Sequence, residues 1–307
     1  MKNQHRSRKI YVFVPCHNRR EQTTQTVSGI IKQLDALPNK YEIHVLDDGS
    51  CDGTSSKILS VNSLVRIHRL SGNELWGGSL NYIIDYCKNV LCPIDNNGAV
   101  LITNDDLYLE KSSLLKEGFK LMAETKDCII APVVVDLNQD EWPETVLEKD
   151  RQFRDSSIVN YGHYFDEKTN GFYPLKKPGV SNLGVTVATW FPICCFKSLD
   201  LIPKSIPHYG SDYWLTKALS NMNFQTITDL RYIICRSKKD TFSSKRRTST
   251  RIRYWYSCCN PKSPDYLLSS VVFLKEFSSS KNKIWVLTFL KIKFLVFRVF
   301  FGKNILN

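Results

Sequence analysis

The amino-acid sequence predicts an α/β protein with a mostly parallel central sheet flanked by helices. The main observation is a rhythm: short β-rich runs alternate with longer helical segments through the first 127 residues, as in βαβ units. The second observation is the composition. The chain has 307 residues, 42% hydrophobic and 23% charged, which allows a large buried core and excludes disordered and fibrous classes. No run of 18 uncharged apolar residues occurs, so a conventional membrane span is not expected.

The elements of the first half follow from their apolar patterns. The first predicted strand, KIYVFVP, is a continuous apolar run, the third alternates, and the fourth, AVLIT, is wholly apolar. The four strands cover residues 9–15, 41–46, 64–70 and 99–103. Helices are predicted over residues 21–37, 55–59, 78–90 and 114–123. Because ligands collect at the carboxyl ends of the strands in such sheets, the residues after each strand are the candidates for chemistry.

From about Cys128 the alternation weakens. Several prolines interrupt the pattern, and the aromatic, polar stretch up to Lys177 predicts loops with short strands. A helix is predicted again over residues 211–222. The second half therefore predicts less regular structure than the first.

The positive charge is concentrated at the C-terminal end. The net charge is +12, yet residues 236–307 alone carry 16 basic and three acidic side chains, and the first 235 residues sum to −1. Such asymmetry favours a polyanionic surface, either membrane phospholipid or nucleic acid, with a solvated basic face as the alternative. No nucleic-acid-binding module accompanies the charge, so the sequence favours a membrane.

Residues 284–301 are mostly apolar but contain three basic side chains, Lys291, Lys293 and Arg298. Charges inside the stretch argue against a span, and with the basic segment before it they favour a peripheral or shallowly inserted membrane contact. A helix that packs on the rest of the protein, or that forms an oligomer contact, is the alternative.

The cysteines favour a reduced compartment. There are ten, but no CxxC pair that would support a zinc site. The apolar run before CHNRR has only five residues, too few for the core of a signal peptide. We therefore expect a cytosolic protein.

The first candidate cluster is Asp47-Asp48-Gly49-Ser50, directly after the strand YEIHVL. Acids at strand ends of α/β sheets commonly accept hydrogen bonds from a base or ribose. The alternative is an Asx turn that caps the next helix, for which Asp-Gly-Ser is suitable. The cluster alone does not distinguish these interpretations.

The second cluster, Asn104-Asp105-Asp106, follows AVLIT. Mg²⁺ and Mn²⁺ take hard oxygen ligands from one or two carboxylates and complete their shell with phosphate and water. A capped turn is the alternative here too, but repulsion between adjacent acids favours a cation partner.

The third cluster is HYGSDYW, in which Asp212 lies close in sequence to His208, Tyr209 and Tyr213. An aromatic, partly desolvated setting raises the pKa of a carboxylate and suits a general base, and the aromatic rings suit stacking on a sugar. In the alternative interpretation, Ser211 and Asp212 are N-cap residues of the following helix.

Five motifs occur in a set order: VFVPCHNR, VLDDGSCDGT, LWGGSLN, LITNDDLYL and PHYGSDYWL. Their order and spacing, from about residue 9 to residue 260, resemble the family 2 glycosyltransferases with a GT-A fold, especially bacterial enzymes of surface-polysaccharide synthesis, including rhamnosyltransferase-like members. The resemblance implies a GT-A catalytic domain over residues 1–235. Its nucleotide-binding half would cover about residues 9–127 and its acceptor half about residues 128–235. A basic extension, helical and peripheral to a membrane, would cover residues 236–307.

Carried over by position, the resemblance also implies site residues. The implied donor nucleotide-binding residues are Pro15, Cys16, His17, Asn18, Asp47, Asp48, Trp76, Gly77, Gly78, Asn81, Asn104 and Asp105. The implied metal ligand for Mg²⁺ or Mn²⁺ is Asp106, with Asp105, and the implied catalytic base is Asp212. The implied acceptor-binding residues are Trp190, His208, Tyr209, Gly210 and Tyr213.

The implied reaction is a metal-dependent single displacement with inversion. A sugar would pass from a UDP- or dTDP-linked donor to a hydroxyl of a glycan or lipid-linked acceptor, in surface-polysaccharide synthesis at the inner face of the plasma membrane. No nucleic-acid partner is expected, and a homo-oligomer stays possible. One departure is Cys259, which stands where the family usually has Arg, so another basic residue such as Arg251 or Arg253 would have to substitute. A catalytically idle GT-A scaffold that binds a nucleotide sugar or a membrane is the alternative function.

Overall fold

The computed structural model describes residues 8–109, 114–125, 128–137, 159–237, 259–263 and 266–279. In its first part, strands and helices alternate as predicted. The strands are β1 (Ile10–Cys16), β2 (Tyr41–Asp47), β3 (Arg66–Arg69) and β4 (Ala99–Ile102). The helices are α1 (Arg20–Asp35), α2 (Thr54–Val61), α3 (Leu75–Tyr86) and α4 (Leu114–Glu124). β1 pairs in parallel with β2 and β4, and β2 pairs in parallel with β3, which confirms the parallel βαβ units.

The second part adds long strands that the sequence analysis did not predict. They are β6 (Ile129–Leu137), β11 (Thr189–Pro192) and β12 (Thr226–Ser237), accompanied by the predicted helix α6 (Ser211–Asn221). β11 runs antiparallel between β4 and β6, and β12 pairs in parallel with β6. Three two-residue strands pair with them: β5 (Leu107–Tyr108), β7 (Val159–Asn160) and β10 (Val180–Ser181). The sheet has the order β10-β12-β6-β11-β4-β1-β2-β3, with β5 on β12 and β7 on β6.

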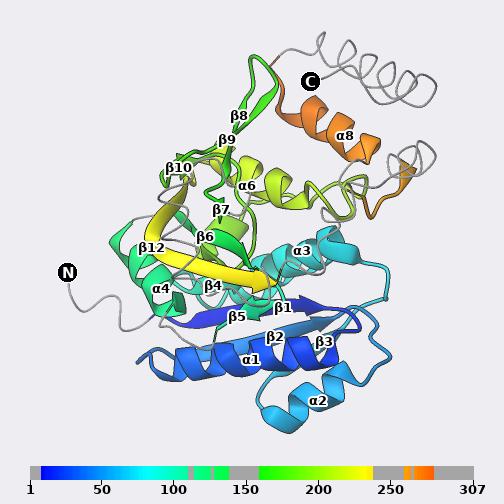
Figure 1. Ribbon diagram of the computed structural model, residues 1–307, viewed down its shortest axis with the longest axis vertical. Coiled ribbons are helices and arrows are strands. Elements are labelled where there is room, and N and C mark those ends of the chain that lie inside the picture. The colour runs from blue at the N-terminus through cyan, green and yellow to red at the C-terminus, as the bar shows by residue number, and fades with distance from the viewer. Residues whose placement is uncertain are drawn as a thin grey trace.

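Helices cover both faces of this sheet (Figure 1). Side chains alternate between the faces of a strand, and β1 supplies both layers of the core. Tyr11 and Phe13 pack in one cluster with α3 and α6, whereas Val12 and Val14 pack in another with α1 and α4. All four side chains are buried. Burial of each aliphatic or aromatic side chain contributes about 1.5–3 kcal/mol to stability, so the two layers hold the strand ends in fixed positions.

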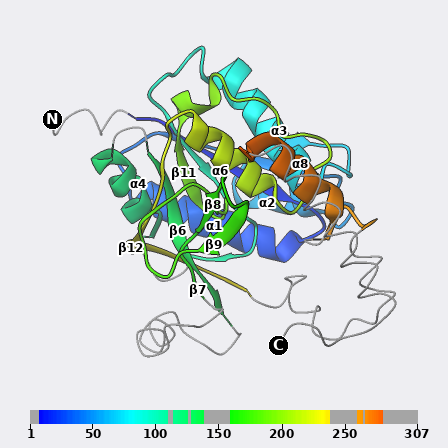
Figure 2. The same cartoon turned by 90° about the horizontal axis from the view of Figure 1, so that it is seen from above.

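A two-stranded hairpin stands beside the last described helix at one end of the molecule (Figures 1 and 2). It consists of β8 (His163–Asp166) and β9 (Gly171–Pro174), and the helix is α8 (Leu267–Phe277). Phe165 of the hairpin packs edge-on against Phe273 of α8, with ring centroids 5.2 Å apart. The rings therefore join the hairpin to a helix that follows the last strand of the main sheet in the sequence.

Most of the basic extension predicted over residues 236–307 lies outside the described residues, including the apolar stretch 284–301. Within the ranges given above, no helix combines the length and the apolar character that crossing a bilayer would require.

Candidate functional site

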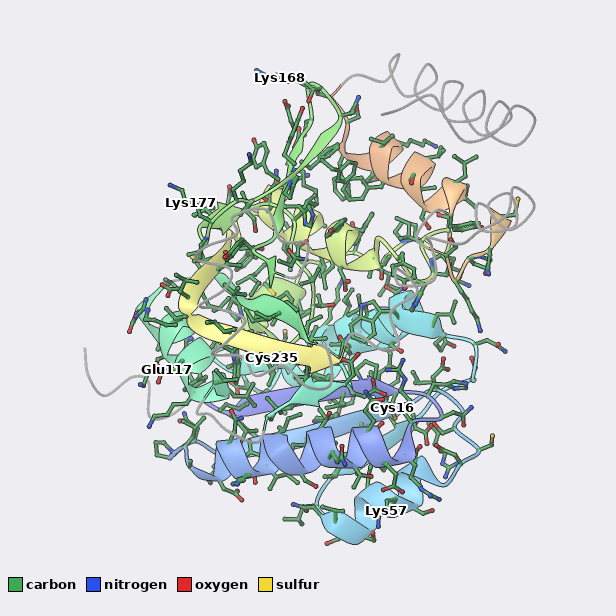
Figure 3. The ribbon with its side chains drawn as sticks, in the orientation of Figure 1. Cys16, Lys57, Glu117, Lys168, Lys177 and Cys235 are labelled. Atoms are coloured by element: carbon green, nitrogen blue, oxygen red, sulfur yellow. The ribbon has the colours of Figure 1, made fainter. Side chains whose placement is uncertain are left out.

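The predicted site residues meet where β1, β2 and β4 end. Cys16, the last residue of β1, pairs in the sheet with Asp47, the last residue of β2. Burial, followed by the charges of Asp105 and Asp47, raises the pKa of the Cys16 thiol, so both carboxylates lie close to its sulfur. Figure 3 shows Cys16 at this edge of the sheet. A buried, neutral thiol is a poor nucleophile, so Cys16 lines the site without reacting.

Asp48 is held by the backbone of the loop that leads into α3. Its Oδ1 accepts hydrogen bonds from the Gly72 N–H at 2.8 Å and the Glu74 N–H at 3.2 Å, and its Oδ2 accepts one from the Leu75 N–H at 3.1 Å. Leu75 has a φ of 57°, in the left-handed region that an aliphatic residue rarely adopts. The Asp48 carboxylate stabilises this turn, and with it the start of α3.

Asp47 holds its own loop. Its Oδ1 accepts a hydrogen bond from the Ser50 N–H at 2.7 Å, and its Oδ2 accepts one from the Ser55 hydroxyl. Neither aspartate of the pair caps α2. The N-cap residue of α2 is Gly53, and the Thr54 N–H after it donates to Asp52 Oδ1 at 3.0 Å. The turn before the helix is therefore closed by Asp52 rather than by Asp47 or Asp48.

The loop after β1 is joined to the loop after β2. Asn18 has a φ of 50°, its N–H donates to the Ser50 hydroxyl at 2.9 Å, and its Oδ1 accepts from the Cys51 N–H at 2.8 Å. His17 Nδ1 donates to the Asp48 carbonyl oxygen. The predicted donor-binding segment Pro15 to Asn18 thus lies directly against the DDGS loop.

Arg19, the next residue, reaches the second carboxylate cluster. Its Nη1 lies 3.0 Å from Asp105 Oδ1 and 4.0 Å from Asp106 Oδ2. The Thr23 hydroxyl donates to Asp105 Oδ2 at 3.3 Å, and the Thr26 hydroxyl donates to the Asp105 carbonyl oxygen at 3.0 Å. The first turns of α1 therefore fix the loop after β4.

The oxygens of this cluster fit a hard cation. Burial raises the pKa of Asp105 to about 6, against the opposing charge of Arg19 and with the added repulsion of Asp106. The Asn104 Oδ1 atom is buried and accepts no hydrogen bond from any described residue. Two carboxylates and a buried amide oxygen are ligands that Mg²⁺ and Mn²⁺ accept. Among the residues described, no three or more His, Cys, Asp or Glu side chains are grouped so that they could hold a metal ion. Further ligands would therefore come from phosphate or water.

Asp212 lies in the first turn of α6 and is held by side chains from two other segments. Its Oδ1 accepts a hydrogen bond from Trp76 Nε1 at 2.6 Å and another from the Thr186 hydroxyl. The N-cap position is occupied by Gly210, with a φ of 90°, and the Ser211 hydroxyl donates to a backbone carbonyl before it. The N-cap interpretation of Asp212 is therefore wrong: its carboxylate is positioned by α3 and by the segment before β11.

His208 connects this carboxylate with the cation cluster. Its Nδ1 accepts a hydrogen bond from the Trp76 backbone N–H at 3.3 Å. Burial, followed by the charges of Lys262 and Arg19, lowers the pKa of His208 to about 4. His208 is therefore neutral at physiological pH, and both cations lie close to it. One site thus includes the ends of β1 and β4, the start of α3 and the start of α6.

Two of the implied donor-binding residues have packing roles. The Gly77 N–H donates to the Pro207 carbonyl oxygen at 2.8 Å, and a Cβ at Gly77 would lie 2.5 Å from the Ile206 carbonyl oxygen, so only glycine allows this approach. Asn81 donates to the Ile202 carbonyl oxygen at 2.9 Å and accepts from the Ile202 N–H at 2.7 Å. Both residues hold the loop before α6 against α3. Gly78 packs against Glu74, and a Cβ added at Gly78 would lie 2.8 Å from the Cβ of Glu74.

Two of the implied acceptor-binding residues, Tyr209 and Tyr213, pack against different neighbours. Tyr209 is 37% exposed and packs edge-on against His208. The Tyr213 hydroxyl is 3.0 Å from His163 Nδ1, and its ring lies 6.4 Å from that of Phe172 in the β8–β9 hairpin. The hairpin is therefore directly connected to the helix that carries Asp212.

Trp190 lies elsewhere. Its side chain is fully buried in the middle of β11, and its ring packs against Phe119 of α4, with centroids 5.4 Å apart. The sequence expectation of an acceptor-binding role is corrected here: the position alternates into the core layer of α4 rather than toward Asp212.

Three residues of the site were not predicted. Arg19 is the last residue of the motif VFVPCHNR but was given no role, and Thr186 lies in none of the five motifs. Lys262 follows Cys259, the position at which a basic residue was expected. Cys259 is exposed at the start of that segment. The suggested substitutes, Arg251 and Arg253, lie outside the described residues. The place of Lys262 in the site follows only from the structure, in which its charge lies near His208.

Comparisons with known proteins agree with this geometry. The family model described as Glycosyl transferase family 2 matches residues 11–217. None of the curated proteins compared matches the sequence. Two solved structures have the same fold. The first, S. aureus TarS residues 1–349, has 14% identity and a TM-score of 0.52. The match covers 95% of this chain and 82% of that TarS fragment. The second, the mannosyltransferase PcManGT from Pyrobaculum calidifontis in complex with GDP-Man and Mn²⁺, has 15% identity and a TM-score of 0.52, covering 96% and 76%.

Proposed function

The chain belongs to glycosyl transferase family 2 and is a glycosyltransferase that uses a nucleotide sugar; on that premise, we propose that it is an inverting, metal-dependent enzyme of surface-polysaccharide synthesis. The donor would be UDP- or dTDP-linked, and the acceptor a hydroxyl of a glycan or a lipid-linked glycan. The structures of PcManGT with GDP-Man and Mn²⁺ and of TarS with UDP support this class of donor and cofactor.

One observation carries the mechanism. Arg19 contacts Asp105, and its charge also lowers the pKa of His208. His208 and Asp212 in turn both accept hydrogen bonds from Trp76. The cation cluster and the Asp212 carboxylate therefore belong to one site. A leaving group held at Asp105 and Asp106 would lie beside an acceptor held at Asp212.

Asp212 is the proposed general base. Two donors, the Trp76 indole and the Thr186 hydroxyl, hold one of its oxygens. These two contacts fix the orientation of the carboxylate that would take the acceptor proton. General base catalysis contributes roughly 10²–10⁴-fold to rate. Since the acceptor oxygen attacks the anomeric carbon directly, the configuration at that carbon inverts.

Asp106 and Asp105, with the Asn104 amide oxygen, would hold Mg²⁺ or Mn²⁺. Such an ion acts as a Lewis acid on the diphosphate leaving group. Lys262 supplies an additional positive charge near His208. We infer that Lys262 takes the place of the Arg that Cys259 replaces.

The test is a binding and turnover screen of sugar nucleotides with and without Mn²⁺, on the wild type, Asp106→Ala and the exposed-site control Asp200→Ala. Turnover of one donor should fall about 100-fold or more in Asp106→Ala, since a bound ion contributes several kcal/mol, and should not change in Asp200→Ala. Full activity in Asp106→Ala would overturn the mechanism. Nucleotide binding without turnover in the wild type would instead favour the idle scaffold.

We also propose that the protein acts at the inner face of the plasma membrane, on an anionic lipid surface. Three features support this placement. The basic tail continues from Ser279, whose hydroxyl donates to the Glu167 carbonyl oxygen at the hairpin tip. Tyr164 and Tyr173, directly opposite each other in the hairpin, are 49% and 51% exposed. Lys168 lies at the same tip (Figure 3), and tyrosine and lysine side chains are typical of membrane interfaces.

Sedimentation of the full chain with phosphatidylglycerol vesicles tests this placement. Replacing Tyr164 and Tyr173 together by Ser should weaken vesicle binding several-fold, because interfacial aromatic area is lost. Leu64→Ser, at an exposed position just after α2, is the control and should bind as the wild type does. Equal binding by all three proteins would contradict the role of the hairpin.

A further inference from the structure

Arg19 is the cation that compensates the carboxylates of the proposed metal site. The side chains of Asp105 and Asp106 are only 8% and 10% exposed. Two adjacent buried carboxylates repel each other, and a buried charge needs a partner or it becomes neutral. The Arg19 guanidinium, 3.0 Å from the nearer oxygen and 4.0 Å from the farther carboxylate, supplies positive charge to both.

Arg19 and a divalent cation would compete for the same oxygens. The guanidinium bonds Asp105 Oδ1, one of the carboxylate oxygens with which this pair would hold a metal. Arg19 differs from a permanent structural partner in one respect, because its side chain is 36% exposed while both acids are buried. Arg19 is the N-cap residue of α1, and its long side chain extends from there to the two acids.

We propose that Arg19 is an exchangeable counter-ion: it occupies the carboxylate pair until a divalent cation replaces it, and it then binds the diphosphate of the donor. The proposal rests on the proposed function, from which it takes the metal and the diphosphate. It adds a residue and an order of events that the family resemblance did not supply.

The surroundings of Arg19 favour the second half of this exchange. The charges of Arg19 and Lys262 both lower the pKa of His208, so both contribute positive potential to this part of the site. A divalent ion at Asp105 and Asp106 would bring the diphosphate to the carboxylates that Arg19 contacts, and Arg binds phosphate oxygens through two parallel N–H donors. Without a diphosphate, the displaced guanidinium would have lost its carboxylate partner.

The exchange therefore predicts that metal and nucleotide bind cooperatively. Metal binding alone must break the Arg19–Asp105 ion pair, and this cost lowers the affinity. When a diphosphate is present, the released guanidinium regains an anionic partner, which removes part of the cost. Coupling of this kind is reciprocal and typically 5- to 150-fold.

Arg20 is a matched control in the same segment. It has the same side chain, but it pairs with Glu21 at 2.9 Å and with the backbone of Asp52, away from the cation cluster. Replacing Arg20 by Gln changes the net charge of the protein by the same amount as replacing Arg19. Any effect that is specific to Arg19→Gln then comes from the carboxylate pair.

The experiment is a Mn²⁺ titration of the full chain by electron paramagnetic resonance, without nucleotide, on the wild type, Arg19→Gln and Arg20→Gln. Arg19→Gln should bind Mn²⁺ about five-fold or more tightly than the wild type, the lower end of typical coupling, and Arg20→Gln should not. A repeat with UDP should raise Mn²⁺ affinity in the wild type and raise it less in Arg19→Gln. If Arg19→Gln does not fold, Arg19→Lys, which keeps the charge and loses the two-pronged contact, should bind Mn²⁺ more tightly than the wild type.

Each outcome separates this proposal from the proposed function. Equal or weaker Mn²⁺ binding by Arg19→Gln, with wild-type affinity in the control, would show that Arg19 only orients Asp105 and would overturn the exchange alone. An absence of Mn²⁺ binding in every protein, with and without UDP, would overturn the metal-dependent mechanism together with the exchange.

Discussion

The aspartate pair after β2 and the aspartate pair after β4 share a sequence pattern but differ in what holds them. Asp48 accepts three hydrogen bonds from backbone N–H groups, and Asp47 accepts from the Ser50 N–H of its own loop and from the Ser55 hydroxyl at the start of α2. Asp105 instead receives a guanidinium and a hydroxyl from α1. Asp212, on α6, is likewise held by side chains, the indole of Trp76 and the hydroxyl of Thr186.

The difference separates acids that support the fold from acids that are available for chemistry. A carboxylate whose lone pairs accept several backbone N–H groups stabilises the loop that carries those groups, and its removal leaves buried donors unsatisfied. A carboxylate held by side chains can exchange those partners for a ligand without leaving backbone donors unsatisfied. The comparison therefore predicts large losses of activity on one side and losses of stability on the other.

The largest effect is expected at Asp212. Asp212→Asn keeps the size of the side chain and its acceptor for Trp76 but removes the base, so transfer should fall roughly 10²–10⁴-fold. Steady-state rates of transfer measure this loss, and the free energy of unfolding should change little. Asp200→Asn makes the same chemical change at an exposed position and should keep full activity. A stable Asp212→Asn protein that transfers sugar at the wild-type rate would place the base elsewhere.

Asp48 should show the opposite behaviour. Asp48→Asn places an amide where three N–H groups need an acceptor, and the free energy of unfolding should fall by about 2–3 kcal/mol. Asp106→Asn is the comparison, because it relieves repulsion between adjacent acids and should leave stability unchanged or slightly higher. Urea unfolding of both variants measures the difference. If Asp106→Asn were the more destabilised protein, the distinction between the two aspartate pairs would fail.

The sequence predicted one half of the fold better than the other for a physical reason. Strands β1 to β4 are separated by single helices, so local periodicity is enough to place them. β6, β11 and β12 pair with strands far away in the sequence, and the prolines between them hide their β pattern. Trp190 was misplaced for the same reason: the side it faces depends on the register of β11 between β4 and β6.

The site was predictable where a motif marks a strand end and unpredictable where the contact is only spatial. Asp106, Asp212 and the DDGS loop follow from motif order. Arg19 belongs to the first motif but was given no role, because its partner Asp105 lies 86 positions away in the sequence. Lys262 was not selected because its role depends on the return of the chain to His208, which no local spacing encodes.

The smallest effect is expected at His44, another buried polar side chain of β2. It tests whether contacts with other side chains are enough to hold a buried polar group that has no functional role. Its ring stacks on Phe13 at 4.8 Å, and its Nδ1 hydrogen-bonds His68 Nε2 at 2.9 Å. Burial, followed by the charge of His68, lowers the pKa of His44 to about 4. Protonation therefore favours the unfolded chain, in which the pKa is about 6.5.

The stability that neutral His44 contributes is complete above about pH 6.5 and is lost as the pH falls toward 4. At about pH 5.5 the loss should be roughly 1–1.5 kcal/mol. Unfolding free energies measured between pH 7.5 and pH 5 should fall less steeply in His44→Gln than in the wild type, while His17→Gln, at an exposed position, should leave the slope unchanged. Because His44 lies in the core layer of α3, transfer at pH 7.5 should be the same in folded His44→Gln as in the wild type. A steeper slope in His44→Gln would mean that other buried groups, such as His68, dominate the acid sensitivity of this layer.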